Sequence, residues 1–66
     1  MDITVNGRLV RVDGSTTVGQ LITQYELSPK TVIVELRGDL LAKEAYDATR
    51  LEAGDTVELI QFVGGG

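Results

Sequence analysis

The fold is decided by one stretch near the start of the chain, Ile3-Thr4-Val5-Asn6-Gly7-Arg8-Leu9-Val10-Arg11-Val12. Its two alternating runs flank Asn6-Gly7, and both of these residues tolerate the positive φ angles of a type I′ turn. We therefore expect a β-hairpin with a two-residue loop. Residues paired across such a loop share a face of the sheet, and the apolar ones should form part of the core. These are Met1, Ile3, Val5, Val10 and Val12. Asp2 then faces Arg11 on the opposite side.

A helix is expected after this hairpin. Thr17 and Gln20 have the spacing of a capping box, in which each side chain satisfies the other residue's backbone N–H. An apolar stripe at helical spacing follows, made of Val18, Leu21, Ile22 and Tyr25. Ser28-Pro29 should end the helix, because proline disfavours helical geometry in the residue before it. We expect Tyr25, and also Tyr46, in the core or at its edge, whereas nothing in the sequence explains Gly19 near the helix start.

Two further strands are expected. Residues 31–36 are rich in β-branched side chains, and residues 56–63 alternate, with Val57 and Leu59 on one face and Ile60 on the other. Residues 40–51 suit a helix by propensity alone, but their apolar spacing is irregular. One helix covers only one face of a sheet, so the pattern predicts a two-layer α+β domain with the first and last strands adjacent.

Composition limits the chemistry. The 66 residues make a single domain, expected to span 1–66, and include no cysteine and no histidine. A disulfide framework, a thiolate nucleophile, the usual zinc ligand set and any Ser-His or Cys-His couple are therefore excluded. The carboxylates are scattered and do not gather into a general acid/base cluster. We expect no metal site and no catalytic residues, so the chain is not expected to be an enzyme.

Charge limits the partners. The net charge is −4, which disfavours binding to nucleic acid phosphates. No apolar run approaches the roughly 20 residues that span a bilayer, and no signal peptide is visible at the N-terminus. We expect a cytoplasmic protein that binds neither nucleic acid nor membrane and is a monomer when free.

The sequence ends with Phe62-Val63-Gly64-Gly65-Gly66. Glycines lose much backbone entropy when ordered, so residues 64–66 are expected to form a flexible tail. Because glycine lacks Cβ, such a tail can thread a narrow channel and present its carboxylate to a buried site. The alternative is a frayed end or a leftover linker without function.

The whole chain resembles the ThiS family of sulfur carrier proteins, which have the ubiquitin-like β-grasp fold. The resemblance lies in the hairpin, the helix start, two strand regions and the glycine end, namely Val5-Asn6-Gly7, Thr17-Val18 with Leu21-Ile22, and residues 32–36, 51–58 and 62–66. It implies one main helix packed across a mixed sheet of four to five strands. It also implies a short strand near Leu40 and Leu41 and one helical turn near Tyr46. Arg37 departs from the family pattern, which often has Asn there.

The resemblance also implies a chemistry. An E1-like adenylating enzyme (ThiF type) would use ATP and Mg²⁺ to adenylate the Gly66 carboxylate, and a sulfur donor such as a cysteine desulfurase would supply sulfur for a thiocarboxylate. A thiazole synthase (ThiG type) in thiamin biosynthesis would receive that sulfur. The carrier itself would bind no cofactor. Three alternatives stay open: a carrier for molybdopterin or cysteine synthesis, conjugation to proteins, and a non-catalytic ubiquitin-like interaction module.

Several residues are candidates for contacts with partners. Gly64 and Gly65 would thread into the activating site, and an apolar patch would dock beside them, formed by Ile33, Ile60, Phe62 and Val63. The alternative for the patch is ordinary exposed apolar side chains. Four acidic residues near the last strands, Glu35, Glu52, Asp55 and Glu58, are expected to be solvated, and together they would steer the domain toward a basic partner.

Overall fold

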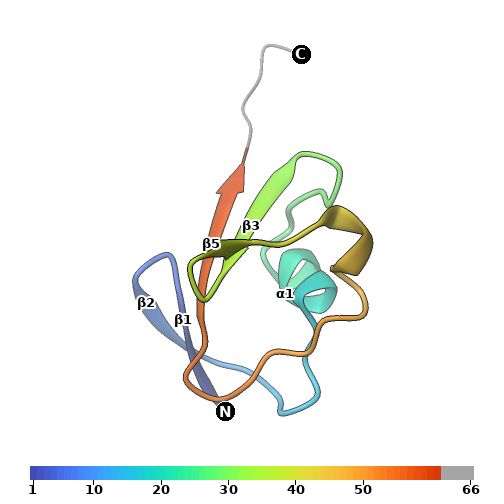
Figure 1. Cartoon of the computed structure of the whole chain (residues 1–66). Helices are drawn as coiled ribbons and strands as arrows, with labels where there is room; N and C mark the ends of the chain where they lie inside the picture. Colours follow the sequence, from blue (N-terminus) through green and yellow to red (C-terminus); the bar gives the residue numbers. More distant parts are fainter. Residues whose placement is uncertain (62–66) are drawn as a thin grey trace.

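The computed structural model describes residues 1–61, and the predictions for Phe62, Val63, Gly64, Gly65 and Gly66 lie outside the described residues. Within these described residues, five strands, one α-helix and one 3₁₀ turn follow one another (Figure 1). They are β1 (Asp2–Val5), β2 (Arg8–Arg11), α1 (Val18–Gln24), β3 (Val32–Leu36), β4 (Asp39–Leu40), η1 (Lys43–Ala45) and β5 (Thr56–Gln61).

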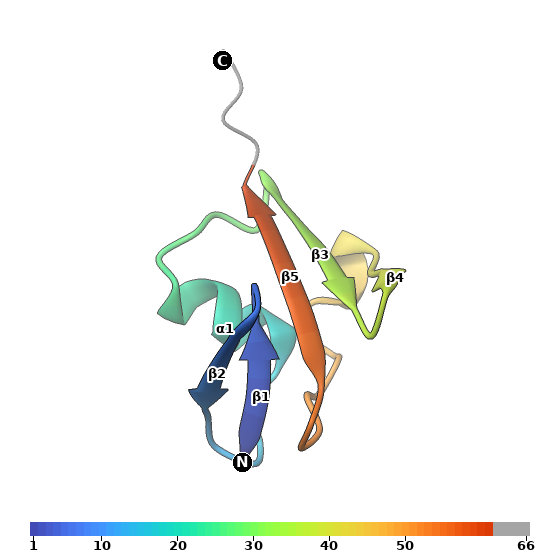
Figure 2. The same cartoon turned by 90° about the vertical axis from the view of Figure 1, so that its left-hand side faces the viewer.

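The strands form one mixed sheet in the order β2-β1-β5-β3-β4 (Figure 2). β1 and β5 are parallel and adjacent in the middle of the sheet, while the other neighbours are antiparallel. α1 lies across one face of this sheet. The predicted two-layer α+β arrangement of the β-grasp type is therefore confirmed, as are the short strand β4 and the single helical turn η1.

The first hairpin has the predicted register. Val5 pairs with Arg8 and Ile3 with Val10, and the loop residues Asn6 and Gly7 have φ angles of 51° and 81°. On the face away from α1, the Arg11 Nε donates to the Asp2 carboxylate at 3.2 Å. The hairpin thus follows directly from the Asn-Gly dipeptide.

α1 begins as its sequence predicts. The backbone N–H of Gln20 donates to Thr17 Oγ1 at 3.1 Å, and that of Thr17 donates to Gln20 Oε1 at 2.9 Å. The helix buries Val18, Leu21 and Ile22. The prediction for Tyr25 is wrong, because α1 ends at Gln24 and Tyr25 is its C-cap, so helical periodicity no longer directs the side chain inward and it is exposed.

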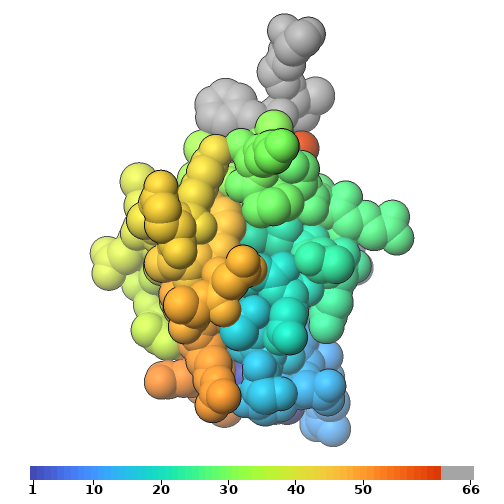
Figure 3. Space-filling model, turned by 90° about the vertical axis from the view of Figure 1, so that its right-hand side faces the viewer, coloured from blue at the N-terminus to red at the C-terminus, as the bar shows by residue number. Residues whose placement is uncertain are grey.

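The segment between β4 and β5 lies beside α1 and covers the core with it (Figure 3). Two backbone hydrogen bonds of 2.9 Å join them, from Val18 N to Thr49 O and from Gly19 N to Tyr46 O. A Cβ on Gly19 would overlap the Asp47 carboxylate. The Asp47 Cα would lie 3.5 Å from that Cβ, which is an ordinary contact, so a side chain at position 19 would require movement of the Asp47 carboxylate.

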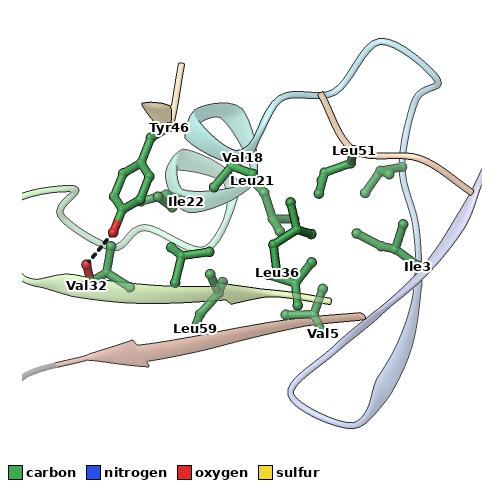
Figure 4. Close-up of a cluster of buried hydrophobic side chains, with 13 residues drawn as sticks. Ile3, Val5, Val18, Leu21, Ile22, Val32, Leu36, Tyr46, Leu51 and Leu59 are labelled. Carbon is green, nitrogen blue, oxygen red and sulfur yellow. Dashed lines mark hydrogen bonds between the residues drawn. The ribbon is translucent and has the colours of Figure 1, made fainter. Parts of the chain in front are cut away.

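The core is a single cluster between the sheet and α1 (Figure 4). Eight of its side chains are almost wholly buried: Ile3, Val5, Val18, Leu21, Ile22, Val32, Val34 and Val57. Burying each such side chain contributes roughly 1.5–3 kcal/mol. Tyr46 is buried as predicted, and its hydroxyl donates to the Val32 carbonyl at 3.0 Å, while burial raises the pKa of this phenol.

Candidate functional site

The face of the sheet opposite α1 is not covered by any described element, and we call it the open face (Figure 2). Strand alternation places one set of side chains on it: Thr4, Leu9, Ile33, Glu35, Leu40, Thr56, Glu58 and Ile60. Three of these are apolar and well exposed, Leu9 and Leu40 at 73% and Ile60 at 45%. The open face is thus the main exposed apolar surface of residues 1–61.

Ile33 and Ile60 lie directly opposite each other on β3 and β5. This confirms the placement predicted for them, on the face opposite Val57 and Leu59, both of which are buried. The next residue of β5, Gln61, pairs with Val32, and its side chain donates to Thr31 Oγ1 at 3.0 Å. The isoleucine pair therefore lies at the end of β5 that leads to residues 62–66.

Asp55 differs from the solvated residue expected from the sequence. Only 6% of it is exposed, and its carboxylate accepts two hydrogen bonds from Arg37, at 2.7 and 3.1 Å. The backbone N–H of Glu52 donates to it at 2.7 Å. Burial on its own raises the pKa of this carboxyl, but the hydrogen bonds outweigh burial, so the pKa is lowered. Asp55 is therefore a structural residue and contributes little to the outer charge.

The other three of these four acidic residues, Glu35, Glu52 and Glu58, differ in whether they have a cationic partner. Glu52 lies 3.5 Å from Arg37 at the edge of the Asp55 pair. Glu35 and Glu58 lie directly opposite each other on the open face, next to the isoleucine pair. Neither forms an ion pair with any residue between 1 and 61. The two glutamates thus remain as uncompensated charge on this face.

Two loop residues hold β5 in place, one near each end. Asn6 is hydrogen-bonded to the backbone of Leu59 in both directions, accepting from its N–H at 2.8 Å and donating to its carbonyl at 3.3 Å. Arg37 binds Asp55, which directly precedes β5. Arg37 has a φ angle of 53° followed by 87° at Gly38, so the second hairpin also has a left-handed loop. Neither contact was predicted from the sequence. The Asn6-Gly7 and Arg37-Gly38 dipeptides indicate turns, but they do not indicate what the Asn6 and Arg37 side chains bind.

The rest of the described surface holds none of the predicted site residues. A polar groove of about 450 Å³ runs along the outer side of α1, between Asp13, Gln20, Thr23 and Asp47. Within residues 1–61 no group of three or more His, Cys, Asp or Glu side chains is arranged to hold a metal ion. In the same range no helix is long and apolar enough to cross a membrane.

Comparison with known proteins agrees with this geometry. The chain is 38% identical over 63 residues to the sulfur carrier protein ThiS of Bacillus subtilis strain 168, covering 94% of this chain and 96% of that protein. The crystal structure of the thiamine biosynthesis protein ThiS from Geobacter metallireducens superposes with a TM-score of 0.83 at 42% identity, covering 100% of both chains.

A third relative is much longer. The whole chain is 30% identical over 66 residues to part of the thiazole synthase of Magnetococcus marinus, and the match spans 20% of that protein. The model of the ThiS family matches residues 3–66. This match covers almost the entire sequence. It agrees with the β-grasp sheet, with the apolar open face at the end of β5 and with the glycine-rich last segment. The chain therefore belongs to the ThiS family.

Proposed function

We propose that the protein is a sulfur carrier of thiamin biosynthesis that delivers sulfur for the thiazole moiety. The observation that carries this proposal is the position of the isoleucine pair, Ile33 and Ile60, at the end of the strand that leads to Gly64-Gly65-Gly66. A partner that docks on this pair is well placed to receive the glycine segment. The similarity to ThiS proteins over the full chain supports the same assignment.

The proposed chemistry takes place on the carboxylate of Gly66. Attack of this carboxylate on the α-phosphate of ATP, in an E1-like adenylating enzyme, forms an acyl-adenylate and releases pyrophosphate. The terminal sulfur of a persulfide on a donor such as a cysteine desulfurase then displaces AMP and forms an acyl disulfide. A second thiol, from a partner protein or a small-molecule reductant, attacks the donor's sulfur, so that the S–S bond breaks, a new disulfide forms on the donor, and a thiocarboxylate stays on Gly66. ATP, Mg²⁺ and the acid/base groups belong to the partner, so the carrier acts as a substrate and not as an enzyme. ATP dependence favours the cytoplasm as its compartment.

The length of the glycine-containing segment restricts where the partner docks. Residues 62–66 span at most about 18 Å when fully extended, at 3.3–3.6 Å per residue. The adenylating site must therefore lie within this distance of Gln61. Ile60 precedes Gln61 directly, so the open face is the surface that an enzyme reaching Gly66 would contact. We propose that Phe62 and Val63 extend this docking patch.

A thiazole synthase is proposed as the recipient of the sulfur. In Magnetococcus marinus a protein named thiazole synthase contains a region similar to this entire chain. Carrier-like and synthase sequences within one polypeptide indicate that the two act together in that organism, which supports a pairing of separate proteins here.

Intact-mass spectrometry tests the function. After incubation with the cognate adenylating enzyme, ATP and a sulfur donor, the mass should rise by the replacement of one oxygen atom with one sulfur atom. Addition of the thiazole synthase and its other substrates should reverse the change. An absent mass shift would contradict the carrier function and favour an interaction module. A shift that the synthase does not reverse would favour a carrier for molybdopterin or cysteine synthesis.

A matched pair of glycine variants tests the role of the tail. Gly65→Phe should prevent the mass shift, because a bulky side chain cannot thread a channel shaped for glycine. Gly14→Phe is the control, since Gly14 has an ordinary φ angle and a Cβ there meets nothing within 4 Å. Equal modification of both variants would contradict tail threading.

A further inference from the structure

Glu35 and Glu58 form an acidic pair in an unfavourable arrangement. They are direct cross-strand neighbours on the open face, where Cβ atoms of opposed residues lie roughly 4.5–5.5 Å apart. Like charges placed directly opposite each other destabilise a sheet. The isolated domain therefore has a feature that its own stability does not explain.

Among residues 1–61 neither glutamate of the acidic pair has an ion-pair partner. On one side lie Ile33 and Ile60, and across the sheet Leu40 pairs with Glu35. Arg11 and Arg37 have other partners: Arg11 binds Asp2 at 3.2 Å, and Arg37 binds Asp55 at 2.7 Å. Glu35 is also half-buried, so its carboxylate is less hydrated than one on a fully exposed side chain.

We propose that Glu35 and Glu58 together receive one cationic side chain of the adenylating enzyme when that enzyme docks on Ile33 and Ile60. This inference rests on the proposed function and adds to it the charge of the partner surface. A guanidinium is the best-fitting group, because its planar fork of donors can bind two carboxylates at once. The partner surface therefore has an apolar centre with an arginine or a lysine beside it.

Two arguments favour this partner over a second copy of the chain. An adenylating enzyme that reaches Gly66 must come within about 18 Å of Gln61, and Ile33 with Ile60 and the acidic pair lie close to that end of β5. Two open faces in contact would instead bring four carboxylates together in a chain whose net charge is already −4. Charge complementarity thus favours the enzyme and opposes self-association through this face.

Glutamine variants give the test. Glu35→Gln and Glu58→Gln keep the side-chain shape and remove the charge, and Glu44→Gln on η1, beside α1 and away from the open face, is the control with the same change in net charge. Each open-face variant should weaken binding to the cognate adenylating enzyme by about tenfold, measured by calorimetry without ATP. Added salt should weaken binding of the wild type more than that of the double variant. Glu44→Gln should bind within about twofold of wild type.

Stability provides a second readout that a purely structural role would not produce. The urea midpoint of the double variant should equal or exceed that of the wild type, because the repulsion is removed while binding is lost. Open-face variants that bind like Glu44→Gln would overturn the proposal, and so would dimerisation of the wild type through this face in sedimentation.

The mass-shift experiment separates this inference from the proposed function. If the wild type acquires sulfur and the glutamine variants bind normally, the acidic pair is not a receptor and the carrier function stands. If the wild type acquires no sulfur, the carrier function fails, whatever the binding data show. At saturating enzyme concentration the double variant should still acquire sulfur, since the variants leave Gly66 and its chemistry unchanged.

Discussion

The two hairpin loops both hold the central strand β5 in place, but through different side-chain chemistry. Asn6-Gly7 and Arg37-Gly38 are both two-residue loops with positive φ angles, 51° and 81° in the first and 53° and 87° in the second. In each loop the first side chain turns back to hold the central strand β5. Asn6 binds the backbone of Leu59 within β5, and Arg37 binds the carboxylate of Asp55 just before it.

The difference between the loops is one of charge and strain. Asparagine adopts a positive φ more readily than most residues. Its side-chain amide can both accept and donate a hydrogen bond, as the backbone of a paired strand does. Arginine has no such preference, so its loop depends on a charged contact with a buried carboxylate. The Asn6 contact should therefore be insensitive to pH, whereas the Arg37 contact requires an ionised Asp55.

The largest expected effect is that of Asp55→Asn. This variant should lower the free energy of unfolding at pH 7 by about 2 kcal/mol, since hydrogen bonds to a charged group are lost from a buried site. The folded-state pKa of Asp55 is lowered, so its contribution is complete above the unfolded-state pKa of about 3.9 and disappears as pH falls through the folded-state value. Urea titrations from pH 7 to pH 2.5 should show the gap between wild type and variant closing. A gap that stays constant with pH would contradict the role of the ionised carboxylate.

A smaller effect is expected for Arg37→Asn. The variant loses the ion pair but gains a residue better suited to the φ angle of 53°. It should be less stable than wild type at pH 7 and more stable than wild type once Asp55 is protonated. A change in the sign of the stability difference between neutral and acidic pH, measured by thermal unfolding, is the distinctive result. A constant deficit at every pH would show that the guanidinium acts by packing alone.

The smallest expected effect is that of Asn6→Gly, about 1 kcal/mol at every pH from 3 to 7. Glycine keeps the positive φ, so only the side-chain hydrogen bonds and some chain entropy are lost. Amide hydrogen exchange at Leu59 should become faster, because its N–H loses its acceptor.

Asn6→Asp makes this loop resemble the other one. The aspartate still accepts from the Leu59 N–H but cannot donate to the Leu59 carbonyl when ionised. Its stability should therefore rise as pH is lowered and the side chain becomes protonated, the reverse of the trend expected from Asp55. Identical pH profiles for wild type and Asn6→Asp would contradict the assigned amide orientation.

Local sequence patterns predicted much of the fold. Asn6-Gly7 determined the register of the first hairpin, Thr17 with Gln20 located the helix start, and alternation around Val57 placed Ile60 on the open face. Each of these features depends on residues close together in the chain. The irregular stretch after β4 became clear only through resemblance to a family.

The errors concern contacts between distant segments. Asp55 is polar and follows a turn, so only its pairing with Arg37 reveals that it is buried. Gly19 lies against the Asp47 carboxylate, and no local pattern specifies the approach of the two segments that contain them. For the candidate site, alternation alone indicated that Ile33 and Ile60 share a face. That Glu35 lies opposite Glu58 follows from the β3–β5 register, which depends on the intervening loops. The roles of Phe62, Val63, Gly64, Gly65 and Gly66 stay predictions.

The parallel contact between β1 and β5 has a consequence for synthesis of the protein in the cell. Thr4 pairs with Thr56 and Val5 with Val57, so the centre of the sheet joins segments that are far apart along the chain. Contacts this distant along the chain must await closure of a long loop and form late in folding. On the ribosome the first hairpin can form early, but the sheet cannot close until residues 56–61 have emerged. A product of premature termination before β5 would lack both a closed core and the glycine segment, and we expect it to remain unfolded.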